Sequence, residues 1–492
     1  MSQILRLNPA DDVAIALTEL AAGTAVEPGL RAAAAIPEGH KLAVRAVAAG
    51  RPVRRYGQVI GLAARDIAPG DWVHEHNLAM TDQPRDAEVG ADANPLPAPA
   101  ARATFEGFRR PDGRVGTRNM IGVLTSVNCS ATVARRIADA FPGDQVAALT
   151  HTAGCGAASS GGDTALLQRT LAGYARHPNF AAVVMVGLGC EANQIPDWMA
   201  REGLTPGDRL HSFTIQEAGG TAKAIEQGRG LVGELLTDAA RARRETVGAD
   251  QLVVGLQCGG SDGWSGITAN PALGAAVDRL IAQGGAAMLS ETPEIYGAEH
   301  LLLRRAASAQ VAEALLDRIA WWRAYADRHG MSLDNNPSPG NRKGGLTTIL
   351  EKSLGAVAKS GSSPLVDVIG YAEPLRRPGL SFMDSPGYDP CSATGQIASG
   401  ATLIVFTTGR GSVFGSRPAP TLKLATNARL AAWMADDVDI DCSPVLAGTS
   451  LSDMGELIFA RMLAVASGQS TASETLGIGE NEFVPWQSGA YL

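Results

Sequence analysis

The stretch LVVGLQCGGSDGWSGITANP, residues 252–271, joins a short apolar run to a turn that is rich in glycine. The run LVVG has the length and the β-branched content of a buried strand. Five glycines lie from Gly255 to Gly266, and only glycine allows both a close backbone approach and a positive φ without strain. The pattern therefore predicts a strand followed by a turn that meets a neighbour at close range, which leaves open an anion cradle, a metal site or a plain tight turn.

Similar apolar runs recur along the chain and alternate with helical patterns. They include QVAALT, AAVVMVGLGC, PLVDVIG and ATLIVFTTG. Continuous apolar runs separated by amphipathic segments are typical of parallel strands that helices bury on both faces. We therefore predict an α/β fold with a mainly parallel sheet, divided near the charged stretch 237–251 into lobes at residues 105–245 and 246–492.

The first part of the chain has a different pattern. Residues 1–78 contain short apolar segments separated by turn signals such as PEGH and APGD, which predicts a small β-rich module. Residues 79–104 are rich in proline, alanine and acidic residues without apolar periodicity, which predicts an extended linker. A chain of 492 residues is also too long for a single core, so two or three domains are expected.

Composition excludes several classes of protein. A formal net charge of -8 and a pI of about 5.6 argue against a nucleic-acid surface, which needs clustered lysine and arginine. The N-terminus lacks a signal-peptide pattern, and no apolar stretch approaches the roughly 18 residues of a membrane span. We therefore expect a cytoplasmic protein without nucleic-acid or membrane partners. Nothing in the sequence encodes an oligomeric state, and a homo-oligomer stays open.

Four of the six cysteines follow the ends of predicted strands: Cys129, Cys155, Cys190 and Cys258. Ligands of open α/β sheets bind at the carboxyl ends of the strands, so this shared position favours a site. Free cysteine is also a common buried small hydrophobe. Since no close CxxC pair occurs, a metal held by these thiols would be assembled from separate loops, and iron, singly or in a cluster, suits thiolate ligands.

Polar and charged residues collect in other turns. An arginine and a lysine in glycine-rich loops, Arg410 and Lys343, are suited to hold a carboxylate. His74 and His76 are two residues apart, and on a strand they would point to one side and share a metal ion or act as acid and base. Each pattern also fits an ordinary solvated turn or a chance pair of surface histidines.

Several long motifs resemble the altronate and galactarate dehydratase family. They are FEGFRRPDGRVGTRN at 105–119, GLGCE at 187–191, QCGGSDGWSGITANPALG from Gln257, NNPSPGNRKGG at 335–345, EKSLGAVAKSGSS at 351–363 and FTTGRGS at 406–412. The first 78 residues resemble the SAF-type β module of the family, including GHK at 39–41 and YGQVIG at 56–61. The resemblance covers nearly the whole chain.

This resemblance implies a hydro-lyase that converts a sugar acid into a 2-keto-3-deoxy acid with the aid of a divalent metal ion, usually ferrous iron. Manganese and zinc also suit mixed thiol, oxygen and nitrogen donors, and an iron–sulfur cluster is a further option. HEHN at 74–77 is similar to the altronate branch, and PCSATGQIASG is closer to the galactarate branch. A third branch expels sulfite from sulfolactate, usually with the small module on a separate chain.

A mechanistic hypothesis assigns roles to these residues. The metal is predicted to lie among Cys129, Cys155, Cys190 and Cys258. The predicted substrate-binding groups are Gly259, Gly260, Ser261, Asn341, Lys343 and Arg410. The predicted catalytic groups are His40, Lys41, His74, His76 and Asp262. The two alternatives from other classes are a hydrolase with a Cys155–His151 nucleophile pair and a non-catalytic sugar-acid binding protein.

Overall fold

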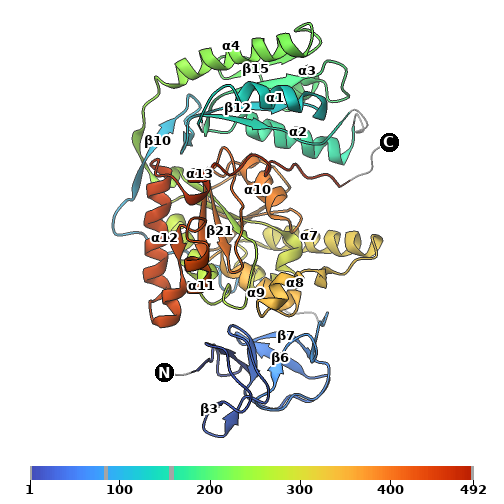
Figure 1. Ribbon diagram of the computed structural model, residues 1–492, viewed down its shortest axis with the longest axis vertical. Coiled ribbons are helices and arrows are strands. Elements are labelled where there is room, and N and C mark those ends of the chain that lie inside the picture. Colours follow the sequence, from blue (N-terminus) through green and yellow to red (C-terminus); the bar gives the residue numbers. More distant parts are fainter. Residues whose placement is uncertain (1–2, 83–86, 144, 155–159, 489–492) are drawn as a thin grey trace.

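The computed structural model describes residues 3–82, 87–143, 145–154 and 160–488. An N-terminal module (residues 3–82), a small lobe (residues 120–239) and a large lobe (residues 253–475) are stacked along the longest axis, with the large lobe in the middle (Figure 1). The module consists of strands, and both lobes are built on parallel sheets. The predicted fold class, a β-rich module followed by a mainly parallel α/β region, is confirmed.

The module consists of short antiparallel strands, and its described residues contain no helix. One sheet has the order β1 (Ile4–Leu5), β2 (Val13–Ala16), β5 (Lys41–Ala43), β8 (Trp72–Val73). A second has the order β6 (Pro52–Arg55), β7 (Gln58–Ala63), β9 (Leu78–Ala79), and β3 (Ala25–Glu27) pairs with β4 (Leu30–Arg31). Turn signals every few residues keep these strands short, as the sequence predicts.

The small lobe has a four-stranded parallel sheet. Its order is β13 (Val146–Leu149), β12 (Met120–Thr125), β14 (Phe180–Gly187), β15 (Leu210–Thr214). Its helices are α1 (Ala131–Ala138), α2 (Gly162–Ala175), α3 (Ile195–Arg201) and α4 (Thr221–Ala239), and the 3-10 turn η1 (Asn128–Ser130) precedes α1. A separate sheet of β11 (Val115–Gly116), β10 (Thr104–Arg109) and β16 (Glu245–Gly248) borders the small lobe in sequence.

The large lobe has a seven-stranded parallel sheet. Its order is β19 (Leu365–Ile369), β20 (Gly379–Met383), β18 (Ala286–Leu289), β17 (Val253–Cys258), β21 (Leu403–Thr408), β22 (Thr421–Ala425), β23 (Ile440–Asp441). The chain starts at β17, builds one side of the sheet, and returns to build the other side from β21. The direction of winding therefore reverses between β17 and β21, and ligands of such sheets bind in the crevice at this switch point.

Helices cover both faces of the large sheet. They are α5 (Ala269–Ala282), α6 (Glu299–Leu303), α7 (Ala309–Arg328), α8 (Pro339–Lys343), α9 (Ile349–Ala358), α10 (Asp389–Ala398), α11 (Ala428–Trp433), α12 (Leu451–Ala466) and α13 (Ala472–Thr475). Further 3-10 turns are η2 (Ala249–Gln251), η3 (Thr292–Ile295), η4 (Leu333–Asn335) and η5 (Ser443–Ala447). None of the described helices is both long enough and apolar enough to cross a bilayer.

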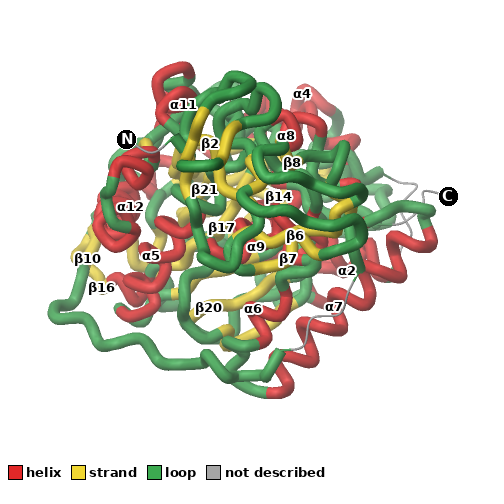
Figure 2. The backbone as a smooth tube through the Cα atoms, turned by 90° about the horizontal axis from the view of Figure 1, so that it is seen from below, coloured by secondary structure: helices red, strands yellow, loops and turns green. Residues whose placement is uncertain are grey.

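The apolar cores of the three regions are partly continuous. Val53 and Ile60 of the module belong to the same buried cluster as Ile349 and Leu354 of the large lobe. A second buried cluster contains residues of the small lobe, such as Met185 and Trp198, and residues of the large sheet, such as Met288 and Ile404. The module therefore packs on the large lobe through buried apolar side chains, and Figure 2 shows its strands β6, β7 and β8 next to α9 and α8.

Candidate active site

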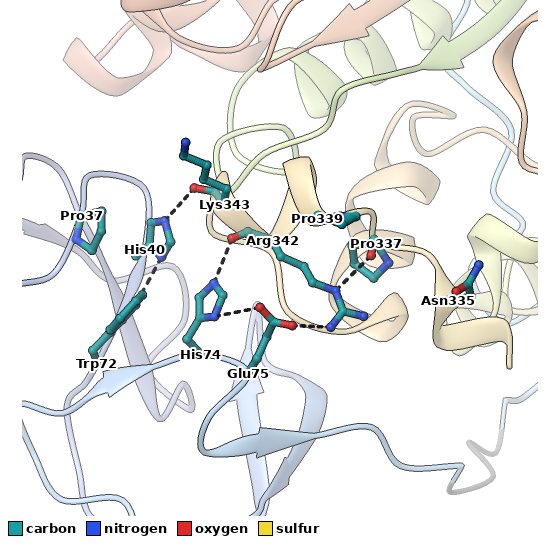
Figure 3. Close-up of a pocket in the computed structure, with 10 residues that line it drawn as sticks. All are labelled: Pro37, His40, Trp72, His74, Glu75, Asn335, Pro337, Pro339, Arg342 and Lys343. Carbon is teal, nitrogen blue, oxygen red and sulfur yellow. Dashed lines mark hydrogen bonds and ion pairs between the residues drawn. The ribbon is translucent and has the colours of Figure 1, made fainter.

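A cleft of about 490 Å³ lies at the switch point of the large sheet, where the module covers its edge. The turns after β17, β21 and β22 contribute Asp262, Arg410 and Asn427 to its wall. The module contributes His40, and the end of α8 contributes Lys343. A second cavity of about 550 Å³ shares His40 and Lys343 with the cleft and lies between the module and α8 (Figure 3).

Three cationic side chains in the cleft, those of Lys343, Arg410 and Arg429, are unpaired among the described residues. Lys343 and Arg410 are exposed to the cleft, and within the described part of the chain neither side chain has a hydrogen bond or an ion pair. The other charged residues of its wall are Glu19, Glu38 and Asp262. Unpaired cations in a concave site favour an anionic ligand, and the arginine fork matches a carboxylate geometrically.

The position of Lys343 follows from the local sequence NNPSPGNRKGG. Ser338 caps α8 in a reciprocal capping box with Asn341, and Pro339 occupies the first turn. The helix stops after five residues, at Lys343, because two glycines follow. The Asn341 side chain also donates a 2.8 Å hydrogen bond to the Ser261 carbonyl, which ties α8 to the turn after β17.

The module holds the end of α8 by donating hydrogen bonds to backbone carbonyls of the large lobe. His74 Nε2 donates to the Arg342 carbonyl at 2.9 Å, and His40 Nε2 donates to the Lys343 carbonyl at 3.2 Å (Figure 3). Lys41 Nζ donates to the Gly345 carbonyl at 2.6 Å. Arg55 donates to the Gly263 carbonyl at 2.6 Å. Each of these module side chains therefore donates to a backbone carbonyl of the large lobe.

A buried ion cluster secures this interface. The Glu351 carboxylate on α9 accepts hydrogen bonds from Lys41 Nζ at 2.9 Å and from Arg55, and all three side chains are fully buried. Burial works against ionisation of Glu351, but the charges of Lys41 and Arg55 outweigh it and lower the pKa of Glu351 to about 2. Burial lowers the pKa of Lys41 to about 8. The pattern of charges in the sequence did not single out Arg55 or Glu351.

Two glycines of the 252–271 stretch, Gly263 and Gly266, meet the module, whereas the other three meet residues of the large lobe. A Cβ on Gly263 would lie 2.3 Å from the Gly39 carbonyl oxygen of the module. A Cβ on Gly345, whose φ is +101°, would lie 2.7 Å from the same oxygen. Both positions therefore need glycine, because a side chain on either would push the module off the large lobe.

Asp262 lines the cleft, but its oxygens are already engaged. Oδ1 accepts from the Trp264 and Ser265 amides at 3.1 and 2.9 Å, and Oδ2 accepts from Thr426 and Asn427 at 3.0 Å. Burial raises its pKa although these hydrogen bonds work in the opposite direction. The carboxylate thus ties the turn after β17 to the turn after β22, which differs from the predicted catalytic role.

The other predicted binding groups of this turn lie behind the cleft wall. The Gly259 amide donates to the Thr407 carbonyl at 3.2 Å, so it is not free to bind a substrate as predicted. The Gly260 carbonyl accepts from the Arg410 amide at 2.9 Å, which fixes the loop that carries the Arg410 side chain. Ser261 is buried, with its hydroxyl 2.6 Å from Cys258 Sγ.

The predicted strand-end cysteines do not come together. Cys129 and Cys190 are exposed at the edge of the small sheet, whereas Cys258 is buried at the end of β17 in the large sheet. Cys155 lies outside the described residues. In the part of the chain that the structure describes, no three histidine, cysteine, aspartate or glutamate side chains are arranged to hold a metal ion. The described cysteines do not form the predicted thiol cage, because strands of two separate sheets carry them, and the place of Cys155 in it stays a prediction.

The predicted pairing of His74 and His76 on one strand face is also wrong. The strand β8 ends at Val73, because the Asn77 side chain closes a turn by accepting from the His74 amide and donating to the Trp72 carbonyl. His74 is buried, and His76 is exposed outside the cleft wall.

Sequence reasoning missed a buried group of carboxylates beside Cys258. Glu291 and Glu294 are nearly inaccessible and Asp389 is half-buried, and both oxygens of Glu291 lack a hydrogen-bond partner among the described residues. Burial and the neighbouring Glu294 raise the pKa of Glu291, and they raise that of Asp389 to about 7. Lys352 donates to Glu294 at 2.6 Å. The signal in the sequence for Glu291 and Glu294 was the acidic segment ETPE, which follows the apolar run AAML after Ser290.

Family models match nearly all of the chain. The model for the altronate/galactarate dehydratase SAF domain matches residues 2–81. The second domain of D-galactarate dehydratase/altronate hydrolase matches residues 107–240. The C-terminal D-galactarate/altronate dehydratase model matches residues 249–491.

Similar proteins come from several bacteria. Altronate dehydratase of Escherichia coli K12 is 37% identical over 488 residues, which are 96% of this chain and 97% of that protein. Galactarate dehydratase (L-threo-forming) of the same strain is 37% identical over 500 residues, 96% of this chain and 95% of that protein. The β subunit of (2R)-sulfolactate sulfo-lyase from Chromohalobacter salexigens is 36% identical over 391 residues, 77% of this chain and 96% of that subunit.

Proposed function

Since this chain belongs to the altronate and galactarate dehydratase family of hydro-lyases, we propose that it removes water from a sugar acid to give a 2-keto-3-deoxy acid. Two of the unpaired cations in the cleft, Lys343 and Arg410, lie in its glycine-rich turns and are the observation that carries this proposal. A sugar acid presents one or two carboxylates and several hydroxyls, and these cations complement the carboxylate.

The reaction breaks the C2–H bond next to the carboxylate and expels the 3-hydroxyl as water. Loss of the C2 proton places further negative charge on the carboxylate oxygens, so cations beside them stabilise the transition state more than the bound substrate. The enol that forms when water leaves then tautomerises to the 2-keto acid. Lys343 and Arg410 would hold the carboxylate and neutralise this developing charge.

Proton transfer needs a group that is free to exchange a proton. His40, His74, Lys41 and Asp262 are all engaged in hydrogen bonds that hold the interface or the turns. In the described part of the cleft wall, the titratable side chains without such a partner are Lys343, Glu19 and Glu38. Because Lys343 is assigned to the carboxylate as a cation, we propose that the proton acceptor is Glu19 or Glu38.

A divalent metal ion remains a proposal that rests on the family resemblance. The predicted cysteines do not fit one, because Cys129 and Cys190 are exposed on one sheet and Cys258 is buried on another. Unpartnered carboxylate oxygens occur at Glu291 and Glu294, yet no three-ligand group forms among the described side chains. Metal content of the purified protein and the effect of a chelator on turnover test this proposal.

The decisive experiment is a turnover assay on altronate, galactarate, other aldonates and sulfolactate, run anaerobically with ferrous iron. We expect a 2-keto-3-deoxy acid from one sugar acid. Release of sulfite from sulfolactate would instead assign the sulfo-lyase activity of the related β subunit. No product from any of these substrates would overturn the proposed function.

Two variants test the cleft. Arg410→Met and Lys343→Met remove one cation each, and each is expected to lower kcat/KM by about 10²- to 10³-fold, since stabilisation of developing charge is of this size. Arg377→Met, at an exposed loop position, is the matched control and should leave kcat/KM unchanged. Full activity in both cleft variants would show that the active site does not lie in this cleft.

A further inference from the structure

Both ring nitrogens of His40 are occupied by hydrogen bonds. The Trp72 indole N–H donates to His40 Nδ1 at 3.2 Å, so Nδ1 acts as an acceptor and carries no proton. The ring proton is therefore on Nε2, which donates to the Lys343 carbonyl. Figure 3 shows His40 between these two partners, with the Lys343 side chain pointing away from Trp72. The ring has no nitrogen left for a substrate.

The surroundings of His40 keep it neutral. His40 is 4% exposed, and its ring stacks on that of His74 at a centroid distance of 5.2 Å. Burial, then the charge of Lys41 and then His74 lower the pKa of His40 to about 4, while the carbonyl of Lys343 and the charge of Glu351 act in the opposite direction. A proton on Nδ1 would also break the hydrogen bond from Trp72.

The carbonyls that the histidines bind are the last ones of α8. The final carbonyls of a helix have no partner within the helix, and α8 has only five residues. The Arg342 carbonyl accepts from the Gly345 amide at 2.9 Å in addition to His74, whereas the Lys343 carbonyl accepts from His40. His40 and His74 donate from the module, and Arg342 is also paired with Glu75 of the module. The module therefore helps to fix the end of α8 from which the Lys343 side chain leaves, together with the hydrogen bond from Asn341 to Ser261.

We propose that His40 is a positioning residue that holds the Lys343 backbone as a neutral hydrogen-bond donor and exchanges no proton with the substrate. This role rests on the proposed function, because it aims Lys343 at the carboxylate of a sugar acid. His74 acts in the same way on the preceding carbonyl, so these two histidines shape the cleft without supplying the acid or the base.

The test compares two substitutions at one position. His40→Gln keeps an N–H donor near the place of Nε2 but has no titratable group, whereas His40→Phe keeps the ring and loses the donor. We expect His40→Gln to stay within about tenfold of wild type in kcat/KM with a pH profile of unchanged shape. We expect His40→Phe to lose about 10²-fold, with a raised KM, because Lys343 is misplaced. His329→Phe, at the exposed end of α7, is the control.

The opposite outcome would overturn the proposal. A proton carrier contributes about 10²- to 10⁴-fold, so His40→Gln would then be as impaired as His40→Phe and would lose one limb of its pH profile.

A second measurement does not depend on turnover or on the stability of a variant. The nitrogen-15 shifts of the histidine rings in the wild-type protein should show His40 protonated at Nε2 alone, without titration between about pH 5 and 9. The His40→Gln spectrum assigns the signal. Titration in this range, or a proton on Nδ1, would contradict the positioning role. If wild type converts no sugar acid, the proposed function fails while this measurement still decides the state of His40.

Discussion

The carboxyl edges of the two parallel sheets carry similar residues, but they differ in which polar side chains lack a hydrogen-bond or ion-pair partner. At the small sheet, Glu191 is buried and accepts from the Ser126 hydroxyl at 2.6 Å and from the Gly189 amide at 2.6 Å. His151 is also buried there and donates to the Thr125 carbonyl at 2.9 Å. At the large sheet, Lys343 and Arg410 face a cleft without partners.

The module accounts for this difference. It covers the edge of the large sheet and donates four side-chain hydrogen bonds to carbonyls there, from His40, His74, Lys41 and Arg55. These bonds satisfy the backbone of the loops and leave the lysine and arginine side chains of the cleft available. Polar residues at the end of a strand therefore indicate a candidate site. Charged side chains without a partner then distinguish a sheet edge that can bind a ligand from one whose polar groups only hold the fold together.

The largest expected effect comes from removing the charge that holds the module on the large sheet. Glu351→Gln leaves Lys41 and Arg55 buried without an anion, and breaking a buried pair in this way costs about 3–5 kcal/mol. The variant should melt well below wild type at pH 7 and lose turnover. Glu313→Gln, on the exposed face of α7, is the matched control.

The pH dependence of this deficit follows from the pKa of Glu351. Its pKa is about 2 in the folded protein and 4.5 in the reference state. The stability that the ionised carboxylate contributes is therefore fully present above about pH 4.5 and is lost as the pH falls through 2. The difference in melting temperature between Glu351→Gln and wild type should shrink over this range. Equal melting temperatures at pH 7 would show that another contact holds the module.

A smaller effect of opposite sign is expected behind the cleft. Asp389 has a pKa of about 7, raised from 3.8 by burial and by Glu294, so its protonated form is favoured in the folded protein. The associated stability is fully present below pH 3.8 and is lost as the pH rises through 7. Asp389→Asn cannot ionise, so it should melt on the order of a few degrees above wild type at pH 8 and equally near pH 4.

Asp317→Asn on the exposed face of α7 is the control for this measurement and should not change the melting curve. A lower melting temperature for Asp389→Asn at pH 8 would mean that the carboxylate is paired with a cation when ionised. The neighbouring cations are Lys352 and Lys359. Their attraction for the Asp389 carboxylate would then be stronger than the repulsion from Glu294.

The smallest effect is expected at the edge of the small sheet. Cys129→Ser and Cys190→Ser change two exposed thiols outside the cleft, so turnover and metal content per chain should stay within about twofold of wild type. Kinetics on the favoured sugar acid and elemental analysis of each variant check this. Loss of bound metal in either variant would instead support the predicted role of these cysteines as metal ligands.

The sequence predicted the fold through local patterns. Apolar runs such as AAVVMVG at β14 and LIVF at β21 predict buried parallel strands, and short runs between turn signals predict the module. It also placed Lys343 and Arg410 in glycine-rich turns, and the structure brings both to one cleft. It did not predict the pairing of Lys41 with Glu351, because these residues are 310 positions apart and contact each other only when the module docks.

By itself the sequence therefore determined which segments form strands, which turns follow them and which family the chain belongs to. These properties depend on periodicity and on residue types within a few turns of backbone. The tertiary structure decided which of the candidate polar residues are free: it buried His40 and Asp262 in hydrogen bonds, separated Cys129 and Cys190 from Cys258, and left Lys343 and Arg410 unpaired. Whether a polar group is free depends on its neighbours in space, and at a domain interface these come from distant parts of the chain.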